Sequence, residues 1–434
     1  MIADAVPVRS RCDPVTGLWT LTAPADTLGR PVVTGDGDAV FLLVGGQPTA
    51  LDPATGKVRW RAAERLPARE DASPVLRPAG SRLVIASDEP GRYRPEPVTL
   101  TGLDTADGTR AWVRDGELLS GFLTDEPSNT LLLWQGHDAA PQHLTAVDLT
   151  DGTVRWRHEF RGVDRPVLVG ERVIASVSAG LRAFDVGTGT ELWRDGANVS
   201  RTGLRLRRGG AGEPVVAAVL RCGELLAIAP DTGERLRTRR CPSNREWVDV
   251  RGAGTALWFN RLRRSFWPGH LLVREPVLGS ARPGRFLIRR PLATVSWDGR
   301  EGLDPIELDG RIYAVLQRRQ DFTPWRRVLG FAGQRVHTAR PGRALALLRP
   351  LPGRPVRRGG FVDMCAGPDR LYLSVHHREH SVTLAYRNGR VLWSAPETFR
   401  ALVPIGDRLL VLTDEDHQDH LRLIDGETGE RCHP

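Results

Sequence analysis

The sequence predicts an all-β protein built from repeated four-stranded antiparallel units, and three observations lead to this prediction. The first is a hairpin motif in which an Asp is followed after four residues by a Gly and after four more by a Trp. The second is that four copies keep all three residues at the same spacing. The third is that no segment longer than a couple of turns shows a helical period. Four-stranded units that recur every 40–50 residues or so are typical of a β-propeller.

Each copy of the motif predicts a strand, a tight turn and a second strand. An apolar or alternating run ends at the Asp, which can bond its own downstream backbone, and the Gly supplies a positive φ in the turn. The Trp follows on the buried face of the second strand, where we expect it to fill the gap between neighbouring units. The four full copies are Asp52, Gly56 and Trp60; Asp104, Gly108 and Trp112; Asp148, Gly152 and Trp156; and Asp185, Gly189 and Trp193.

Weaker copies extend the series to nine candidate units. One keeps Gly233 but has Arg237 in place of the Trp, another keeps Gly389 and Trp393, and the last keeps only its Asp and Gly before the chain ends. The sixth and seventh units are the least regular. Two further strand-like runs precede each hairpin, which gives four strands per unit. We expect eight blades, with seven or nine as alternatives.

We expect one domain over residues 1–434, because each blade needs its neighbours to bury its faces. Within it, residues 1–24 would form an N-terminal closing strand and residues 25–434 the blades. The ninth unit leaves little chain for an outer strand, so we predict that residues 17–23, which include Trp19, complete the last blade. This closure by the N- and C-terminal strands would also bring Cys12 near Cys432.

The charge pattern argues against a nucleic-acid partner. The net charge of +9 comes from 61 basic and 52 acidic residues, which are spread along the chain without a known nucleic-acid motif. No apolar segment approaches the length of a membrane span, and the N-terminus lacks the apolar region of a signal peptide. The five scattered cysteines fit a reducing compartment. We therefore expect a cytoplasmic protein with no membrane partner.

The tandem motif resembles the tryptophan-docking repeat of pyrroloquinoline-quinone-type (PQQ-type) β-propellers. The resemblance covers nearly the whole chain, and it is strong over residues 38–237 and 370–434. That family includes quinoprotein dehydrogenases and cofactor-free relatives, such as the outer-membrane assembly lipoprotein and sensor domains of actinobacterial kinases. The resemblance predicts the fold well and the function poorly.

We expect no quinone cofactor in this member of the family. The dehydrogenases of this family are exported and carry adjacent, disulfide-bonded cysteines beside the quinone. The resemblance therefore implies these features for a quinone-binding member. No two cysteines are adjacent in this chain: they are Cys12, Cys222, Cys241, Cys365 and Cys432.

The histidines gather on one predicted face of the propeller. Loops from the second to the third strand of a blade, and from the fourth strand to the next blade, emerge on the same rim. Nine of the 11 histidines map to this rim: His137, His143, His158, His270, His376, His377, His380, His417 and His420. The sequences "HHREH" and "DEDHQDH" lie on the last two units, so these loops could converge.

The candidate catalytic residues are His376, His377, His380, His417 and His420. Of these, His377, His380, His417 and His420 are the candidate ligands of a divalent metal ion such as Zn, Mn or Fe, because imidazole is both a general base near neutral pH and a common metal ligand. Exposed hairpin loops also collect polar residues without any function. A metal site, metal-free acid–base catalysis and plain surface loops therefore stay open.

Two functions follow from these alternatives. The first is a cofactor-free propeller that acts as a ligand-binding or scaffolding module, with a small molecule or a protein partner at the rim. The second is a propeller enzyme, a lyase or cyclase of bacterial specialised metabolism, that uses the histidine-rich rim. No nucleophile elbow, phosphate loop or dinucleotide fingerprint is present.

Overall fold

The computed structural model describes most of the chain between residues 6 and 431. The described residues are 6–66, 74–88, 96–135, 142–160, 163, 166–197, 199, 205–208, 214–219, 225–239, 245–253, 256–263, 273–280, 306–308, 311–316, 335–339, 346–347, 361–376, 382–387, 390–395 and 399–431.

The described elements are all strands, numbered along the chain. The first part of the chain contains β1 (Arg9–Cys12), β2 (Trp19–Pro24), β3 (Val32–Val33), β4 (Val40–Val44), β5 (Gln47–Leu51), β6 (Val58–Arg61), β7 (Val75–Ala79), β8 (Arg82–Ala86), β9 (Glu96–Asp104), β10 (Arg110–Leu119), β11 (Gly121–Asp125), β12 (Thr130–Trp134), β13 (Gln142–Asp148), β14 (Val154–Phe160), β15 (Val167–Val169), β16 (Arg172–Val177), β17 (Gly180–Asp185) and β18 (Glu191–Asp195).

The second part contains β19 (Arg205–Arg208), β20 (Pro214–Val219), β21 (Leu225–Ile228), β22 (Arg235–Arg239), β23 (Arg245–Ala253), β24 (Ala256–Arg263), β25 (Val273–Ser280), β26 (Ile306–Leu308), β27 (Arg311–Leu316), β28 (Arg335–Ala339), β29 (Ala346–Leu347), β30 (Phe361–Ala366), β31 (Leu371–His376), β32 (Val382–Arg387), β33 (Arg390–Ala395), β34 (Ala401–Ile405), β35 (Arg408–Glu415) and β36 (Gln418–Asp425). No helix long and apolar enough to cross a membrane occurs among the described residues.

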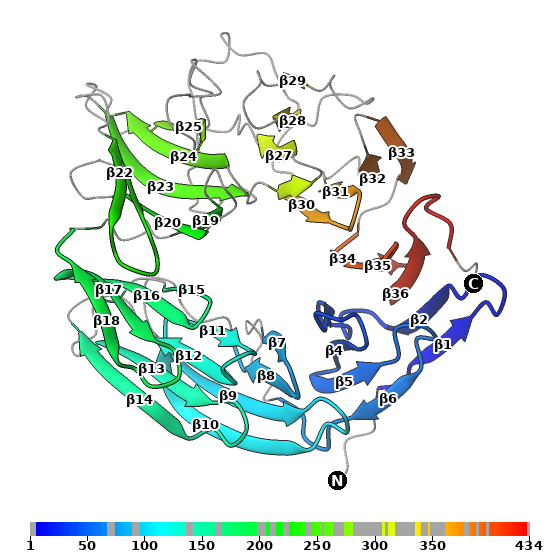
Figure 1. Ribbon diagram of the computed structural model, residues 1–434. Coiled ribbons are helices and arrows are strands. Elements are labelled where there is room, and N and C mark those ends of the chain that lie inside the picture. Colours follow the sequence, from blue (N-terminus) through cyan, green and yellow to red (C-terminus); the bar gives the residue numbers. More distant parts are fainter. Residues whose placement is uncertain are drawn as a thin grey trace, which may run out of the picture.

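The strands form antiparallel sheets arranged in a ring, as Figure 1 shows. In each regular sheet the first strand lies nearest the axis of the ring, a region that we call the central channel, and the fourth lies at the perimeter. The innermost strands contact one another around the ring: β3 with β7, β7 with β11, β15 with β19, β19 with β23, β23 with β26, β26 with β30, β30 with β34, and β34 with β3. The predicted all-β propeller is confirmed.

The described strands group into nine sheets, which matches the nine sequence units. The expected number of eight blades is therefore not confirmed. The sheet of β23–β25 has three described strands, and it falls in the least regular part of the sequence. The sequence predicts one blade and one irregular insertion in this part of the chain, because neither the sixth nor the seventh unit keeps the spacing of Asp, Gly and Trp.

The ring closes by strand exchange between the two ends of the chain. The last sheet runs in the order β1-β2-β36-β35-β34, so that β2 supplies its fourth strand and β1 adds a fifth. Strand β2 pairs with β36 over six residues, from Trp19 opposite Leu423 to Pro24 opposite Gln418. The prediction that residues 17–23 complete the last blade is confirmed.

The predicted Asp–Gly turn is present in each regular hairpin, and the third unit shows how it forms. Asp148 Oδ1 accepts a hydrogen bond from the Thr150 amide at 2.7 Å, and the Gly152 amide donates to the Asp148 carbonyl at 2.9 Å. Gly152 has a φ of +74°, which a residue without a Cβ adopts at no steric cost. The turn residues thus set the register of β13 against β14.

Each docking tryptophan bridges to the next blade. Trp156 is 8% exposed, and its indole N–H donates to the Val186 carbonyl at 2.9 Å in the following hairpin. Its ring lies so close to Gly189 that a Cβ there would be 2.5 Å from Trp156 Cγ. The same contact to a Gly in the next unit recurs for Trp19, Trp60, Trp112, Trp193 and Trp393. The predicted role between units is confirmed, and the core lies between adjacent sheets.

Candidate functional site

The histidines of the last sheet lie near the closure of the ring. His420 is in β36, opposite Thr22 of the closing strand, and its Nδ1 is 3.1 Å from the Thr22 hydroxyl oxygen. His420 is half-buried. In the described structure its imidazole therefore helps to join the two ends of the chain, and its role as a metal ligand stays a prediction.

His417 lies in the turn between β35 and β36 and is exposed. Asp416 and His417 both have positive φ values, of 52° and 59°. A two-residue hairpin loop with two positive φ values is a type I′ turn, and Asp and His tolerate this conformation better than most residues. The turn alone is a sufficient structural reason for these two residue types.

The other candidate ligands cannot be placed against His417 and His420. His376 ends β31, where its backbone pairs with Phe361, and His377 and His380 lie outside the described residues. Across the part of the chain that is described, no group of three or more His, Cys, Asp or Glu side chains could hold a metal ion. Convergence of the two histidine loops stays a prediction.

Two further histidines of the predicted rim lie in the sheet of β11–β14, on another part of the ring (Figure 1). His158 stacks on Phe184 with ring centroids 4.7 Å apart, and its Nε2 is 2.7 Å from the Gly189 carbonyl. It therefore packs between blades, a role that the sequence did not indicate. Burial lowers the pKa of His143, and the nearby Arg157 lowers it further. His137 and His270 lie outside the described residues.

A buried carboxylate next to His420 holds the closure together. Asp419 is fully buried, and its Oδ2 accepts hydrogen bonds from the Thr27 and Leu28 amides at 2.8 and 2.7 Å. Its Oδ1 accepts from Arg400 Nη1 at 2.9 Å. Because charge-assisted bonds to a buried carboxylate are strong, this residue fixes the chain where β2 leads into the first blade.

A second polar group joins the last two sheets at the opposite end of the strands. Arg387 contacts Asp369 at 2.8 Å and Glu427 at 2.5 Å, and the buried Arg370 contacts Asp369 at 2.6 Å. Burial raises the pKa of Tyr372, which packs beside them. Asp369 and Glu427 each pair with both arginines, so the cluster is an interblade link, although Arg370 Nη1 and the Tyr372 hydroxyl are buried without a hydrogen-bond partner in the described structure.

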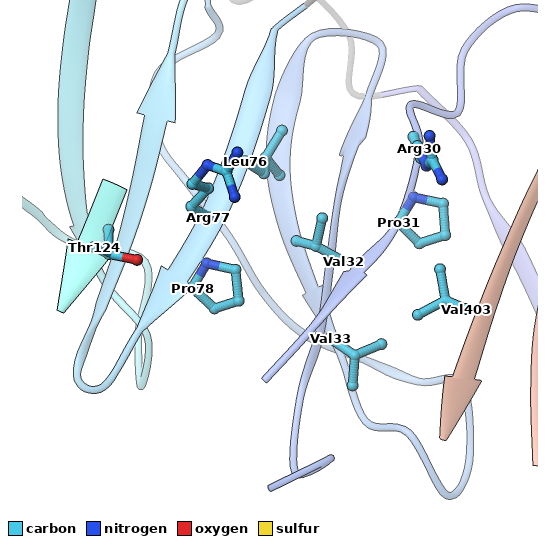
Figure 2. A pocket seen from close by; sticks show the side chains of 9 residues that line it. All are labelled: Arg30, Pro31, Val32, Val33, Leu76, Arg77, Pro78, Thr124 and Val403. Carbon is cyan, nitrogen blue, oxygen red and sulfur yellow. The ribbon is translucent and has the colours of Figure 1, made fainter. Parts of the chain in front are cut away.

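A pocket of about 370 Å³ opens on the wall of the central channel, and we call it the channel pocket. Four innermost strands or their approaches contribute to it: β34, β3, β7 and β11 (Figure 2). Its lining residues are Arg30, Pro31, Val32, Val33, Leu76, Arg77, Pro78, Thr124 and Val403. Pockets that take small ligands usually measure roughly 300–1,000 Å³, so this one has room for a small molecule.

The channel pocket mixes charged and apolar side chains. In Figure 2 Arg77 and Pro78 lie on one side of Val32 and Val33, and Arg30, Pro31 and Val403 lie on the other. Arg77 is exposed, and its guanidinium carbon lies 5.3 Å from the centre of the buried Phe122 ring. At this distance the guanidinium cation is attracted to the face of the ring.

The channel pocket did not emerge from the sequence. A signal exists in hindsight, because Arg30 and Pro31, and again Arg77 and Pro78, place an Arg before a Pro in or next to the first strand of a unit. In a propeller that strand faces the channel. The pocket depends on how four blades meet, however, and no residue pattern in the chain indicates the register between blades.

The fold and the docking tryptophans together define a tryptophan-docking β-propeller. A family model described as "Outer membrane protein assembly factor BamB" matches residues 10–136 and 131–257, which is more than half of the chain. The chain therefore belongs to this family of PQQ-like repeat proteins. No curated protein matches the chain.

Several solved structures are similar to the chain. BamB from Moraxella catarrhalis is 13% identical, with 96% of this chain and 99% of that chain covered and a TM-score of 0.37. The computationally designed Ika8 protein is 11% identical, with 92% and 96% covered and a TM-score of 0.43. Quinohemoprotein alcohol dehydrogenase from Comamonas testosteroni is 12% identical, with 95% and 76% covered and a TM-score of 0.47.

Proposed function

We propose that this propeller is a ligand-binding module whose ligand enters the central channel and is held in the channel pocket. The observation that carries the proposal is the pocket itself, an open hollow of about 370 Å³ whose lining combines two arginines and a threonine with prolines, valines and a leucine. Ligand sites in proteins commonly combine apolar side chains with a few polar groups that orient the ligand.

The surrounding structure supports a site of fixed shape. The pocket lies on strands whose blades are linked by Trp19, Trp60 and Trp112, each of which donates an indole hydrogen bond to the next unit. Sites on rigid strands hold their geometry better than sites on loops. A ligand would therefore meet a largely preformed surface.

Two variants that fill the channel pocket test this proposal. Val33→Trp and Val403→Trp place a large side chain from different strands into the pocket, and Val154→Trp is the control, because Val154 is 46% exposed on the outer strand β14. Small anionic, neutral and cationic fragments would be screened by ligand-observed NMR. We expect fragments that bind the wild type and the control but neither filled variant.

The proposal is wrong if every bound fragment still binds both filled variants, or if no fragment binds the wild type. Thermal unfolding of all three variants would show that they are folded. Two substitutions on separate strands guard against the failure of one of them to fold.

A protein partner is the second candidate, and the description of the matching family as an assembly factor favours it. An extended segment of a partner could reach the same channel. Isothermal titration of the wild type and the two filled variants with such a partner would separate a channel contact, lost in both variants, from a contact elsewhere.

A further inference from the structure

We propose that the channel pocket takes a small organic acid, with a carboxylate held by Arg77 and the apolar part of the molecule against the prolines and valines. This inference rests on the proposed function, because it names the ligand class of the same pocket. Three properties of the described residues carry it: the sign of the charge, the position of the Arg77 guanidinium, and the nature of the opposite wall.

The charge of the pocket favours an anion. Strands β3, β7, β11 and β34 contain only two ionisable residues, Arg77 and Asp125. Asp125 accepts hydrogen bonds from the amide and the hydroxyl group of Ser128, so its carboxylate serves the turn that follows β11. Arg30 lines the same pocket. A ligand of the opposite sign is attracted to this wall.

The position of Arg77 favours a planar acceptor. Its guanidinium carbon lies over the Phe122 ring, 5.3 Å from the ring centre, and the side chain is exposed. A carboxylate can accept two parallel N–H bonds from a guanidinium, and a guanidinium that already contacts a ring loses less freedom on binding. Phe122 is therefore a positioning residue for Arg77.

The rest of the wall favours an organic acid over inorganic phosphate. Phosphate sites usually rely on clustered backbone N–H groups at a helix N-terminus or a glycine-rich loop. This wall is built from strands and includes Pro31 and Pro78, which have no N–H to offer. Pro78, Val33 and Val403 instead present an apolar surface to a hydrocarbon chain.

The test is a titration of the full chain with four probes, followed by NMR or calorimetry. Glutarate and pentanoate carry carboxylates on similar carbon chains, pentylamine carries the opposite charge, and inorganic phosphate is an anion without an apolar part. We expect binding of the two carboxylates, weakened by salt, and weaker or no binding of pentylamine and phosphate.

Variants of one residue assign the contact. Arg77→Gln should weaken carboxylate binding roughly tenfold to a hundredfold, which is the range for a lost hydrogen bond to a charged group. Arg77→Lys keeps the charge but loses the fork, so it should fall between Arg77→Gln and the wild type. Arg194→Gln is the control: it removes the same charge at a side chain that is 74% exposed on the outer strand β18, and it should change nothing.

The outcomes separate this inference from the proposed function. Binding of pentylamine or phosphate as strong as that of the carboxylates, or carboxylate binding that Arg77→Gln leaves unchanged, overturns the inference. If neutral or cationic fragments still bind the wild type but not Val33→Trp and Val403→Trp, the proposed function stands without it. If no probe or fragment depends on the pocket, both are wrong.

Discussion

Trp19 lies directly opposite Leu423 in the pairing of β2 with β36, and this is the register position of a docking tryptophan. In the third unit Trp156 lies opposite Ala146, two residues before Asp148, just as Leu423 lies two residues before Asp425. The Trp19 indole donates to the Pro53 carbonyl at 2.8 Å in the first blade. The N-terminus thus supplies the tryptophan that the last unit lacks.

Replacing Trp19 should destabilise the ring as much as replacing a docking tryptophan inside the chain. Trp19 is fully buried, and we expect Trp19→Ala to lower the free energy of unfolding by about 3–5 kcal/mol, the range for large aromatic truncations in a core. Val15→Ala is the control, because Val15 is 90% exposed in the same segment. Urea denaturation measures both, and equal midpoints for Trp19→Ala and the wild type would contradict the closure.

Trp156 and Gly189 form one contact, so their substitutions should not add. We expect Trp156→Ala to cost about 3–5 kcal/mol, and Gly189→Ala to destabilise because its Cβ would lie 2.5 Å from the indole. In the double variant the overlap is removed, and the cost of Gly189→Ala should fall.

Gly170→Ala is the matched control for this pair. Gly170 also has a positive φ, of 55°, but nothing lies within 4 Å of its Cβ position, so its cost comes from the backbone conformation alone. Thermal melting of the five proteins tests the interpretation. An unchanged midpoint for Trp156→Ala would mean that Trp156 does not lie between blades.

Removing residues 1–24 should leave the last blade without its fourth strand. We expect the shortened protein to be insoluble or markedly less stable, because the deletion takes away all six residue pairs between β2 and β36 and the Trp19 contact. A peptide of residues 9–24 added in trans should restore stability, and a scrambled peptide should not. A shortened protein that folds as well as the full chain would show that the closure contributes nothing.

The turn carboxylates should make stability depend on pH. Burial alone would raise the pKa of Asp148, but hydrogen bonds from Arg155 and Thr150 outweigh it and leave this pKa below its ordinary value. A group whose pKa is lowered in the folded state contributes stability above its unfolded value of about 3.9, and the contribution is lost as the pH falls through the folded value.

Asp148→Asn isolates this effect because it keeps the turn acceptor and removes the charge. We expect the wild type to be more stable than the variant at neutral pH, by less than about 1 kcal/mol because the ion pair is partly exposed. The difference should shrink below a pH of about 4. Urea unfolding over this pH range measures it, and a difference that grows on acidification would contradict the assignment.

Most of the fold could be predicted because its determinants are local. Asp148, Gly152 and Trp156 act within one hairpin and its neighbour, so their spacing is visible in the chain. Trp19 follows Gly17 by two residues, whereas Trp156 follows Gly152 by four. The equivalence of the two tryptophans is therefore visible only in the register of Trp19 opposite Leu423. The proximity of Cys12 and Cys432 stays a prediction, since Cys432 lies outside the described residues.

The candidate site was much harder to predict because it depends on which residues of different blades meet. The histidine pattern is conspicuous in the sequence, yet local contacts explain His158 and His420, and the type I′ turn is reason enough for His417. The channel pocket joins residues as far apart as Arg30 and Val403, whose proximity follows from ring closure. The composition and the local patterns of the sequence do not reveal such a site.

The histidine rim remains testable in its own right. If it holds a metal ion, replacing His377 and His417 together by Ala should abolish the metal content, or an activity if one is found, with little loss of stability, since loop residues seldom carry the core. Elemental analysis of the wild type and the double variant measures this directly. Wild-type protein purified without any bound metal, and side chains that share no cavity, would leave the binding module as the better account.

A crystal structure of the full chain with glutarate tests the central claim most directly. We predict glutarate in the channel pocket between β3 and β7, with one carboxylate on the Arg77 guanidinium and the carbon chain against Pro78 and Val33. Glutarate bound elsewhere, or an empty channel pocket at a concentration that saturates binding in solution, would contradict the account.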